Sequence, residues 1–182
     1  VEEDTGERQI VKCNWFDLLF LKFSPLHLFR KVYVGNPSCT FIKRDVDLFY
    51  NNKFKFVVDF EYYMRCFKRN NNWQYIDDVL LNIGFHNEQV TKYTFLVAEV
   101  QIPENHQLLR QRGEGILRNV FVYDYYWRMY RNLNIRSVAE VKKYTSEEIH
   151  DLLVQMINFQ KNISPALLKI GVVSKLCMLI NY

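Results

Sequence analysis

The chain has 182 residues, of which 49% are hydrophobic and 24% are charged, and its formal net charge is +4. This composition is typical of a globular protein with a sizeable core, and it excludes wholesale disorder. The charge is too small and too scattered to require a nucleic-acid partner. Only six glycines are present, which argues against a Gly-rich phosphate loop.

The first half of the chain mixes helical and β-type patterns. Helical spacing of apolar residues occurs in three segments, residues 14–23, 25–33 and 59–69. Short runs of β-favouring residues predict strands at residues 38–43, 73–76 and 79–85. In residues 59–69 the stripe of Phe60, Tyr63, Met64 and Phe67 faces one side of the predicted helix.

The second half, residues 94–182, reads almost entirely as helix. Ser137 with Glu140 and Thr145 with Glu148 match the capping box, a pattern that begins helices. Pro165 suits the first turn of a last helix, which we expect to run over residues 166–180. That segment is apolar on most sides and carries two lysines, which favours a buried or membrane-surface helix over a spanning one.

Two acidic positions could carry chemistry. Asp45 and Asp47 have the spacing of a divalent-metal pair, but Asp is also a routine turn residue. Asp59 follows an apolar run at the start of a predicted helix. It fits either an N-cap, whose carboxylate accepts amide hydrogen bonds, or a general base that faces a cleft.

Other candidate residues also admit two interpretations each. His86 ends a predicted strand and could contact a metal or a phosphate, or form a surface hydrogen bond. The aromatic and cationic residues 123–131 could stack on sugars or bases, or pack in a helical core. Four widely spaced cysteines favour buried thiols rather than a zinc site or disulfides.

Four short motifs follow one another along the chain. They are Gly-Asn-Pro-Ser at 35–38, Val-Asp-Phe-Glu-Tyr-Tyr at 58–63, Trp-Gln-Tyr-Ile at 73–76, and Leu-Asn-Ile-Gly-Phe-His at 81–86 before a polar tail. Their order resembles the C-terminal half of the GT-A domain in family 2 glycosyltransferases of bacteria. The similar stretch covers about residues 30–92, and residues 121–131 are similar to a helical tail of some members.

The resemblance implies a fold and a set of site residues. The fold would be α/β, with a partial GT-A catalytic domain over residues 1–93 and a mainly helical extension over residues 94–182. Asp59 falls on the catalytic base that deprotonates the acceptor hydroxyl. His86 falls on the histidine near the donor diphosphate and a divalent metal, Mg²⁺ or Mn²⁺. Asn36, Pro37 and Ser38 fall on the floor of the acceptor or donor pocket.

The sequence departs from the family pattern in two ways. Val58 stands where an acidic residue commonly precedes the base. The half of the family domain that holds the nucleotide and the metal-binding Asp-x-Asp motif has no counterpart here. Asp45 and Asp47 are not that motif, because they follow the 35–44 segment instead of preceding it.

The resemblance predicts a glycosyltransferase that moves a sugar from a nucleotide-sugar donor to the hydroxyl of a glycan or lipid-linked acceptor, in polysaccharide synthesis. This chain would be an incomplete part of that enzyme, inactive alone. The alternative is a non-enzymatic helical interaction module that binds a protein partner or an anionic membrane surface. The polar opening of the sequence lacks the pattern of a secretory signal, so we expect a cytoplasmic location, with or without peripheral membrane attachment.

Overall fold

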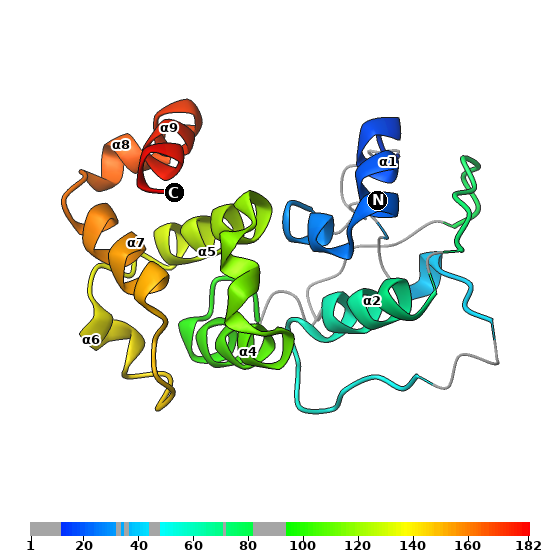
Figure 1. Ribbon diagram of the computed structural model, residues 1–182, viewed down its shortest axis with the longest axis horizontal. Helices are drawn as coiled ribbons and strands as arrows, with labels where there is room; N and C mark the ends of the chain where they lie inside the picture. The colour runs from blue at the N-terminus through cyan, green and yellow to red at the C-terminus, as the bar shows by residue number, and fades with distance from the viewer. Residues whose placement is uncertain (1–11, 32–33, 35–36, 44–47, 71, 82–93) are drawn as a thin grey trace, which may run out of the picture. The chain divides into compact units, whose positions relative to one another are not determined.

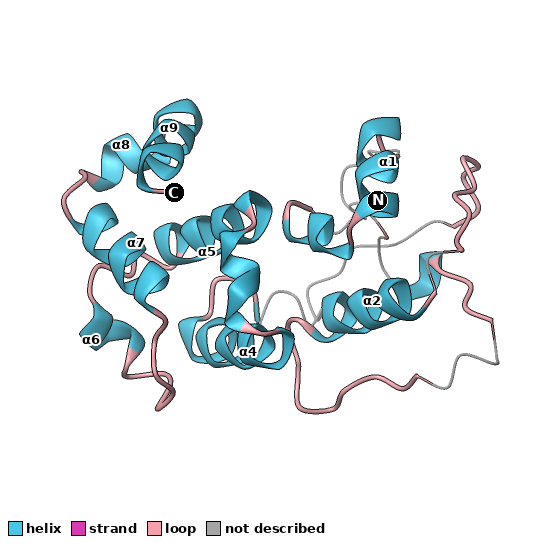
Figure 2. Cartoon of the chain, in the orientation of Figure 1, coloured by secondary structure: helices cyan, strands magenta, loops and turns pink. Residues whose placement is uncertain are grey.

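The computed structural model describes residues 12–31, 34, 37–43, 48–70, 72–81 and 94–182. Over these residues it contains helices, turns and loops and no β-strand (Figure 2). The α/β class expected from the sequence is therefore wrong, and the described residues have an all-helical fold. The chain divides into two compact units, Val1–Phe95 and Leu96–Tyr182.

The N-terminal unit contains two α-helices and two short 3₁₀ helices among its described residues. They are α1 (Trp15–Phe23), η1 (Pro25–Phe29), η2 (Pro37–Cys39) and α2 (Val58–Arg69). Asn14 begins α1, because its side chain accepts a hydrogen bond of 3.1 Å from the Phe16 amide. The core of the unit includes an edge-to-face contact between Phe29 of η1 and Phe60 of α2, whose ring centroids are 4.7 Å apart.

The strands expected in this unit are not formed in the described residues. Residues 40–43 and 72–81 are irregular, and the part of the third predicted strand beyond Leu81 lies outside the described residues. Large apolar side chains in these segments are exposed, namely Phe41, Ile42, Ile76, Val79, Leu80 and Leu81. β-propensity reports how well a side chain fits a half-buried pleated surface, so a β-type run without such a surface does not form a strand.

The C-terminal unit is helical throughout, as the sequence predicts for residues 94–182. Its elements are α4 (Ala98–Arg112), η3 (Glu114–Arg118), α5 (Val120–Asn132), α6 (Val138–Val141), α7 (Asp151–Lys161), α8 (Pro165–Lys169) and α9 (Gly171–Asn181). In Figure 1, α8 and α9 lie next to each other, and α7 contacts both α5 and α9.

The helix starts in this unit only partly follow the predicted capping boxes. Ser137 caps α6 by accepting from the Glu140 amide at 3.2 Å, while Glu140 accepts from the Arg136 amide instead of the Ser137 amide. The second box is wrong as a helix start. Thr145 accepts from the Glu147 amide in a local turn, and α7 begins after His150, whose Nδ1 accepts from the Leu152 amide.

The expected last helix is two helices. Pro165 takes the predicted position in the first turn of α8, but the chain leaves the helical conformation at Ile170 and restarts as α9 at Gly171. Glycine weakens a helix interior, which is consistent with a break at this point. Among the described residues, no helix has the length and apolar character needed to cross a membrane.

Candidate functional site

Asp59 lies in the first turn of α2, where it does not act as a cap. The N-cap position is Val57, and no side chain makes a capping hydrogen bond there. The N-cap interpretation of Asp59 is therefore wrong. Its carboxyl group is half-buried, and this burial raises its pKa above the ordinary value of 3.8. The position thus holds a carboxylate that is easier to protonate than one in water.

Tyr63 is a buried tyrosine on which charges from two segments of the N-terminal unit act. Burial raises the pKa of Tyr63 far above its ordinary value, and the charges of Asp59 and Cys39 raise it further. An interaction with the side chain of Thr40 works in the opposite direction. One tyrosine side chain therefore lies within electrostatic range of both the first turn of α2 and the end of η2.

The surroundings of Asp59 are rich in tyrosine. The rings of Tyr50 and Tyr62 stack with centroids 4.2 Å apart. The Arg65 guanidinium lies 5.5 Å from the centre of the Tyr62 ring and forms an ion pair of 2.8 Å with Glu61. Arg65 also donates to the Phe49 carbonyl at 2.7 Å, which fixes the loop before α2 to the helix. Tyr62 is buried and Tyr50 is 45% exposed, so Tyr50 is the ring of this stacked pair that faces solvent.

The remaining predicted site residues are only partly placed. Pro37 and Ser38 are exposed in η2. They directly precede Cys39 and Thr40, the two residues of this segment that affect the pKa of Tyr63. Asn36 and His86 lie outside the described residues, as do Asp45 and Asp47. Within the described part of the chain, no group of three or more His, Cys, Asp or Glu side chains is arranged to hold a metal.

Asp59 lines neither of two open hollows on the described surface. One is beside α1 and is lined by Trp15, Leu18, Leu19, Lys22, Trp73, Gln74 and Tyr75. The other is in the C-terminal unit and is lined by Leu117, Arg118, Tyr123, Leu152 and Tyr182. Neither hollow can be predicted from the sequence, because their lining residues come from segments far apart in the chain.

The aromatic residues of α5 form the core of the C-terminal unit. Tyr123, Tyr126, Trp127 and Tyr130 are at most 1% exposed, so the core interpretation is confirmed and these rings are not an exposed stacking surface. Their polar atoms have partners. The Tyr126 hydroxyl donates to the Asn105 carbonyl at 2.7 Å, and the Tyr130 hydroxyl lies 2.8 Å from His106 Nε2.

Helix α9 has an unusual distribution of side chains. Its buried face carries Ser174, Met178 and Asn181, spaced at four and three residues. Its outward face carries four apolar side chains, Val172 (73% exposed), Leu176 (56%), Leu179 (50%) and Ile180 (76%). A surface helix of a globular protein ordinarily has the reverse arrangement, with the apolar stripe towards the core.

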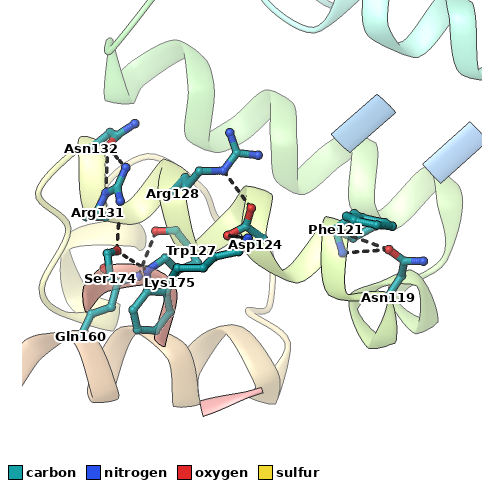
Figure 3. Close-up of polar contacts among 11 residues, drawn as sticks. Asn119, Phe121, Asp124, Trp127, Arg128, Arg131, Asn132, Gln160, Ser174 and Lys175 are labelled. Atoms are coloured by element: carbon teal, nitrogen blue, oxygen red, sulfur yellow. Dashed lines mark hydrogen bonds and ion pairs between the residues drawn. The ribbon is translucent and has the colours of Figure 1, made fainter. Parts of the chain in front are cut away.

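Two polar anchors, Ser174 and Asn181, hold α9 in this orientation. The Trp127 indole N–H and the Arg131 guanidinium both donate to Ser174 Oγ at 3.0 Å (Figure 3). The Asn181 amide donates to the Tyr123 hydroxyl. Because these buried groups satisfy one another, the outward direction of the apolar face follows from the core of the unit. The sequence does not reveal these anchors, since Ser and Asn in an apolar helix do not show which face they occupy.

The charges around α9 are cationic, apart from one carboxylate. Lys175 forms an ion pair of 2.8 Å with Asp124 of α5, which also pairs with Arg128 at 3.2 Å (Figure 3). Lys169, in α8, is exposed. From residue 152 to residue 182 the sequence contains no Asp or Glu.

The cysteines also differ from their expected state. No disulfide joins them, but none is fully buried, and Cys39 is exposed.

Comparisons of the chain with models of protein families, with curated proteins and with solved structures found no match.

Proposed function

We propose that the chain is the acceptor-side part of a glycosyltransferase, with Asp59 as the base that receives the proton of the acceptor hydroxyl. The supporting observation is the environment of Asp59. The carboxylate has no capping role, burial raises its pKa, and its charge acts on the buried Tyr63, as does that of Cys39 at the end of η2. The order of motifs in the sequence is the second support. The described residues form helices and no strand, so this support applies to the activity and not to a GT-A fold.

The proposed reaction needs a proton acceptor beside the attacking oxygen. As the acceptor oxygen bonds to the anomeric carbon of the donor sugar, its proton moves to the Asp59 carboxylate and the nucleoside diphosphate leaves. A raised pKa makes the carboxylate a stronger base, which helps this proton transfer. We propose that the donor diphosphate and a divalent metal, Mg²⁺ or Mn²⁺, bind near His86.

The test is transfer from nucleotide-sugar donors by the full product of the gene, with Asp59→Asn as the variant. Asn has the size of Asp but accepts no proton, so transfer should fall by at least about a hundredfold while donor binding stays unchanged. Asp78→Asn is the matched control, because Asp78 is an exposed carboxylate of the same unit. An Asp59→Asn protein with full activity would exclude Asp59 as the base.

The 182-residue chain alone provides a second measurement. The sequence contains no counterpart of the family's nucleotide-binding half, so the chain should not bind UDP-sugars or GDP-sugars tightly. Calorimetry with both donor classes measures this directly. Micromolar binding by the chain would contradict its assignment as the acceptor-side part.

A second candidate function is a non-enzymatic helical interaction module, and the outward face of α9 favours it. Contiguous exposed apolar side chains are typical of binding surfaces. The two candidates differ in their dependence on Asp59. An interaction module keeps its binding in the Asp59→Asn variant, whereas a glycosyltransferase loses its turnover.

A further inference from the structure

The outward face of α9 exposes a group of apolar side chains to solvent. Val172, Leu176, Leu179 and Ile180 lie on one side of an 11-residue helix, and Leu167 and Ile170 of the preceding segment are also about half exposed. The polar anchors Ser174 and Asn181 prevent these side chains from turning inward. Exposed apolar surface of this kind is favourably removed from water by a binding partner.

The charge of the segment indicates the chemistry of that partner. Residues 152–182 include Lys161, Lys169 and Lys175 and no acidic residue. Lys169 precedes the apolar face along the chain, and Lys175 lies within its span, between Val172 and Leu176. The side chain of Lys175 is 52% exposed even while it pairs with Asp124. An apolar face bordered by lysines matches the boundary between acyl chains and anionic headgroups in a bilayer.

The size of the face argues against a second copy of the chain as the occupant. A helix of 11 residues is about 16 Å long, since each residue adds about 1.5 Å. One face of that helix falls short of the roughly 800 Å² per partner that a stable protein interface buries. A membrane surface sets no such requirement, because each side chain enters the lipid independently and the lysines add electrostatic attraction.

We propose that the outward face of α9 binds the chain to the surface of an anionic membrane, with α9 lying in the plane of the interface. The helix enters the headgroup region through Val172, Leu176, Leu179 and Ile180, and Lys169 contacts anionic lipid headgroups. This inference deepens the second candidate function by naming the partner of the face. It is independent of glycosyl transfer and of Asp59.

The experiment is co-sedimentation of the full chain with vesicles at physiological ionic strength. One set of vesicles contains phosphatidylcholine alone, and the other contains about one third phosphatidylserine. We expect at least about tenfold stronger binding to the anionic vesicles, weakened by high salt because screening reduces the contribution of the lysines. Equal binding to both kinds of vesicle, or no binding to either, would overturn the proposal.

Two variants assign the binding to α9. Leu176→Gln with Ile180→Gln makes the outward face polar without touching the polar anchors, so binding should fall at least about tenfold while helicity and melting temperature stay the same. Lys169→Glu should weaken binding to anionic vesicles only. The matched control is Val79→Gln with Leu80→Gln, which changes two exposed apolar residues of the other unit and should leave binding unchanged.

Two results would overturn the assignment. The first is a Leu176→Gln, Ile180→Gln protein that binds as tightly as the wild type. The second is a wild-type chain that does not bind vesicles but is a dimer, together with a variant that is a monomer. Sedimentation equilibrium would detect this difference. The second result would make another copy of the chain the occupant of the face. Neither result bears on sugar transfer, so the glycosyltransferase proposal is tested separately.

Discussion

His106 shows how burial at a single residue sets its charge. Its ring is 4% exposed, and its Nε2 lies 2.8 Å from the Tyr130 hydroxyl. Burial lowers the pKa of His106 from 6.5 to about 4, while the nearby Glu147 carboxylate opposes the shift. The imidazole is therefore neutral in the folded chain at pH 7. The sequence could not reveal this, because the contact joins residues 24 positions apart.

We expect the C-terminal unit to lose stability as the pH falls from 6.5 towards 4. In that range the unfolded chain binds a proton at His106 that the folded chain does not, so the contribution is fully present above pH 6.5. The free energy of unfolding should drop by up to about 1.4 kcal/mol per pH unit. The measurement is denaturant unfolding followed by Trp127 fluorescence in a Trp15→Phe, Trp73→Phe background. His106→Gln should flatten the slope, and a slope that persists would show that other groups cause it.

We expect Asn14 to stabilise the start of its helix by capping, and Asp59 not to do so. Asn14 accepts from the Phe16 amide and caps α1, whereas Asp59 makes no capping hydrogen bond at α2. Asn14→Ala should therefore cost about 1 kcal/mol of stability, and Asp59→Ala should cost none of this capping energy. Thermal unfolding followed by circular dichroism compares the two variants. A loss of stability in Asp59→Ala larger than that in Asn14→Ala would show that Asp59 caps α2 after all.

At the scale of elements, amphipathic stripes proved better predictors than β-type runs. The stripe of Phe60, Tyr63 and Met64 predicts α2 within one residue of its start, because burial of that face stabilises the helix. The run at residues 38–43 failed, because an apolar run does not show whether a neighbouring strand exists to receive its hydrogen bonds. Thr145 failed for a different reason. Its hydroxyl supports a local turn at Glu147, which competes with a helix start.

Two glycines at helix ends should respond to alanine in opposite directions. Gly113 ends α4 with φ +87°, and a Cβ there meets no atom within 4 Å, so only backbone strain opposes a side chain. Gly113→Ala should cost about 1 to 2 kcal/mol. Gly171→Ala, at the first residue of α9 and equally unobstructed, should gain about 0.4 to 1 kcal/mol. Denaturant unfolding of both variants measures the difference, and equal effects would contradict this account.

At the scale of the whole molecule, the chain contains two units with separate cores. The C-terminal unit has its own set of buried aromatic residues on α5, and the hydrogen bonds of Tyr130 with His106 and of Trp127 with Ser174 lie within it. The sequence predicted a change of character after residue 93, close to the division between Phe95 and Leu96. It did so because the change from β-type runs to helical spacing is a local property of the chain.

We expect residues 96–182 to fold without the rest of the chain. The aromatic core residues Tyr126, Trp127 and Tyr130 all come from this unit and are at most 1% exposed. The fragment should show a helical circular dichroism spectrum and a cooperative thermal transition close to that of the same unit in the full chain. A fragment that unfolds gradually over a broad temperature range would show that the unit depends on residues 1–95.

The candidate site was predicted only in part. Asp59 was identified from its position between an apolar run and a helical stripe, which are local signals. Tyr63 was assigned to the core stripe, and its link to the η2 segment depends on how α2 packs. The anchors of α9 were missed for the same reason, since the partners of Ser174 are more than 40 residues away in sequence.

The anchors of α9 also determine how this helix is rotated about its own axis. Half a turn would bury Leu176 and Ile180, and each large apolar side chain gains about 1.5 to 3 kcal/mol when it is fully buried. The turn does not occur because it would separate Ser174 from Trp127 and Asn181 from Tyr123, and each buried polar group left without a partner costs about 1 to 3 kcal/mol. Two hydrogen-bonded side chains thus fix the rotation of α9, and its four apolar side chains stay in contact with solvent.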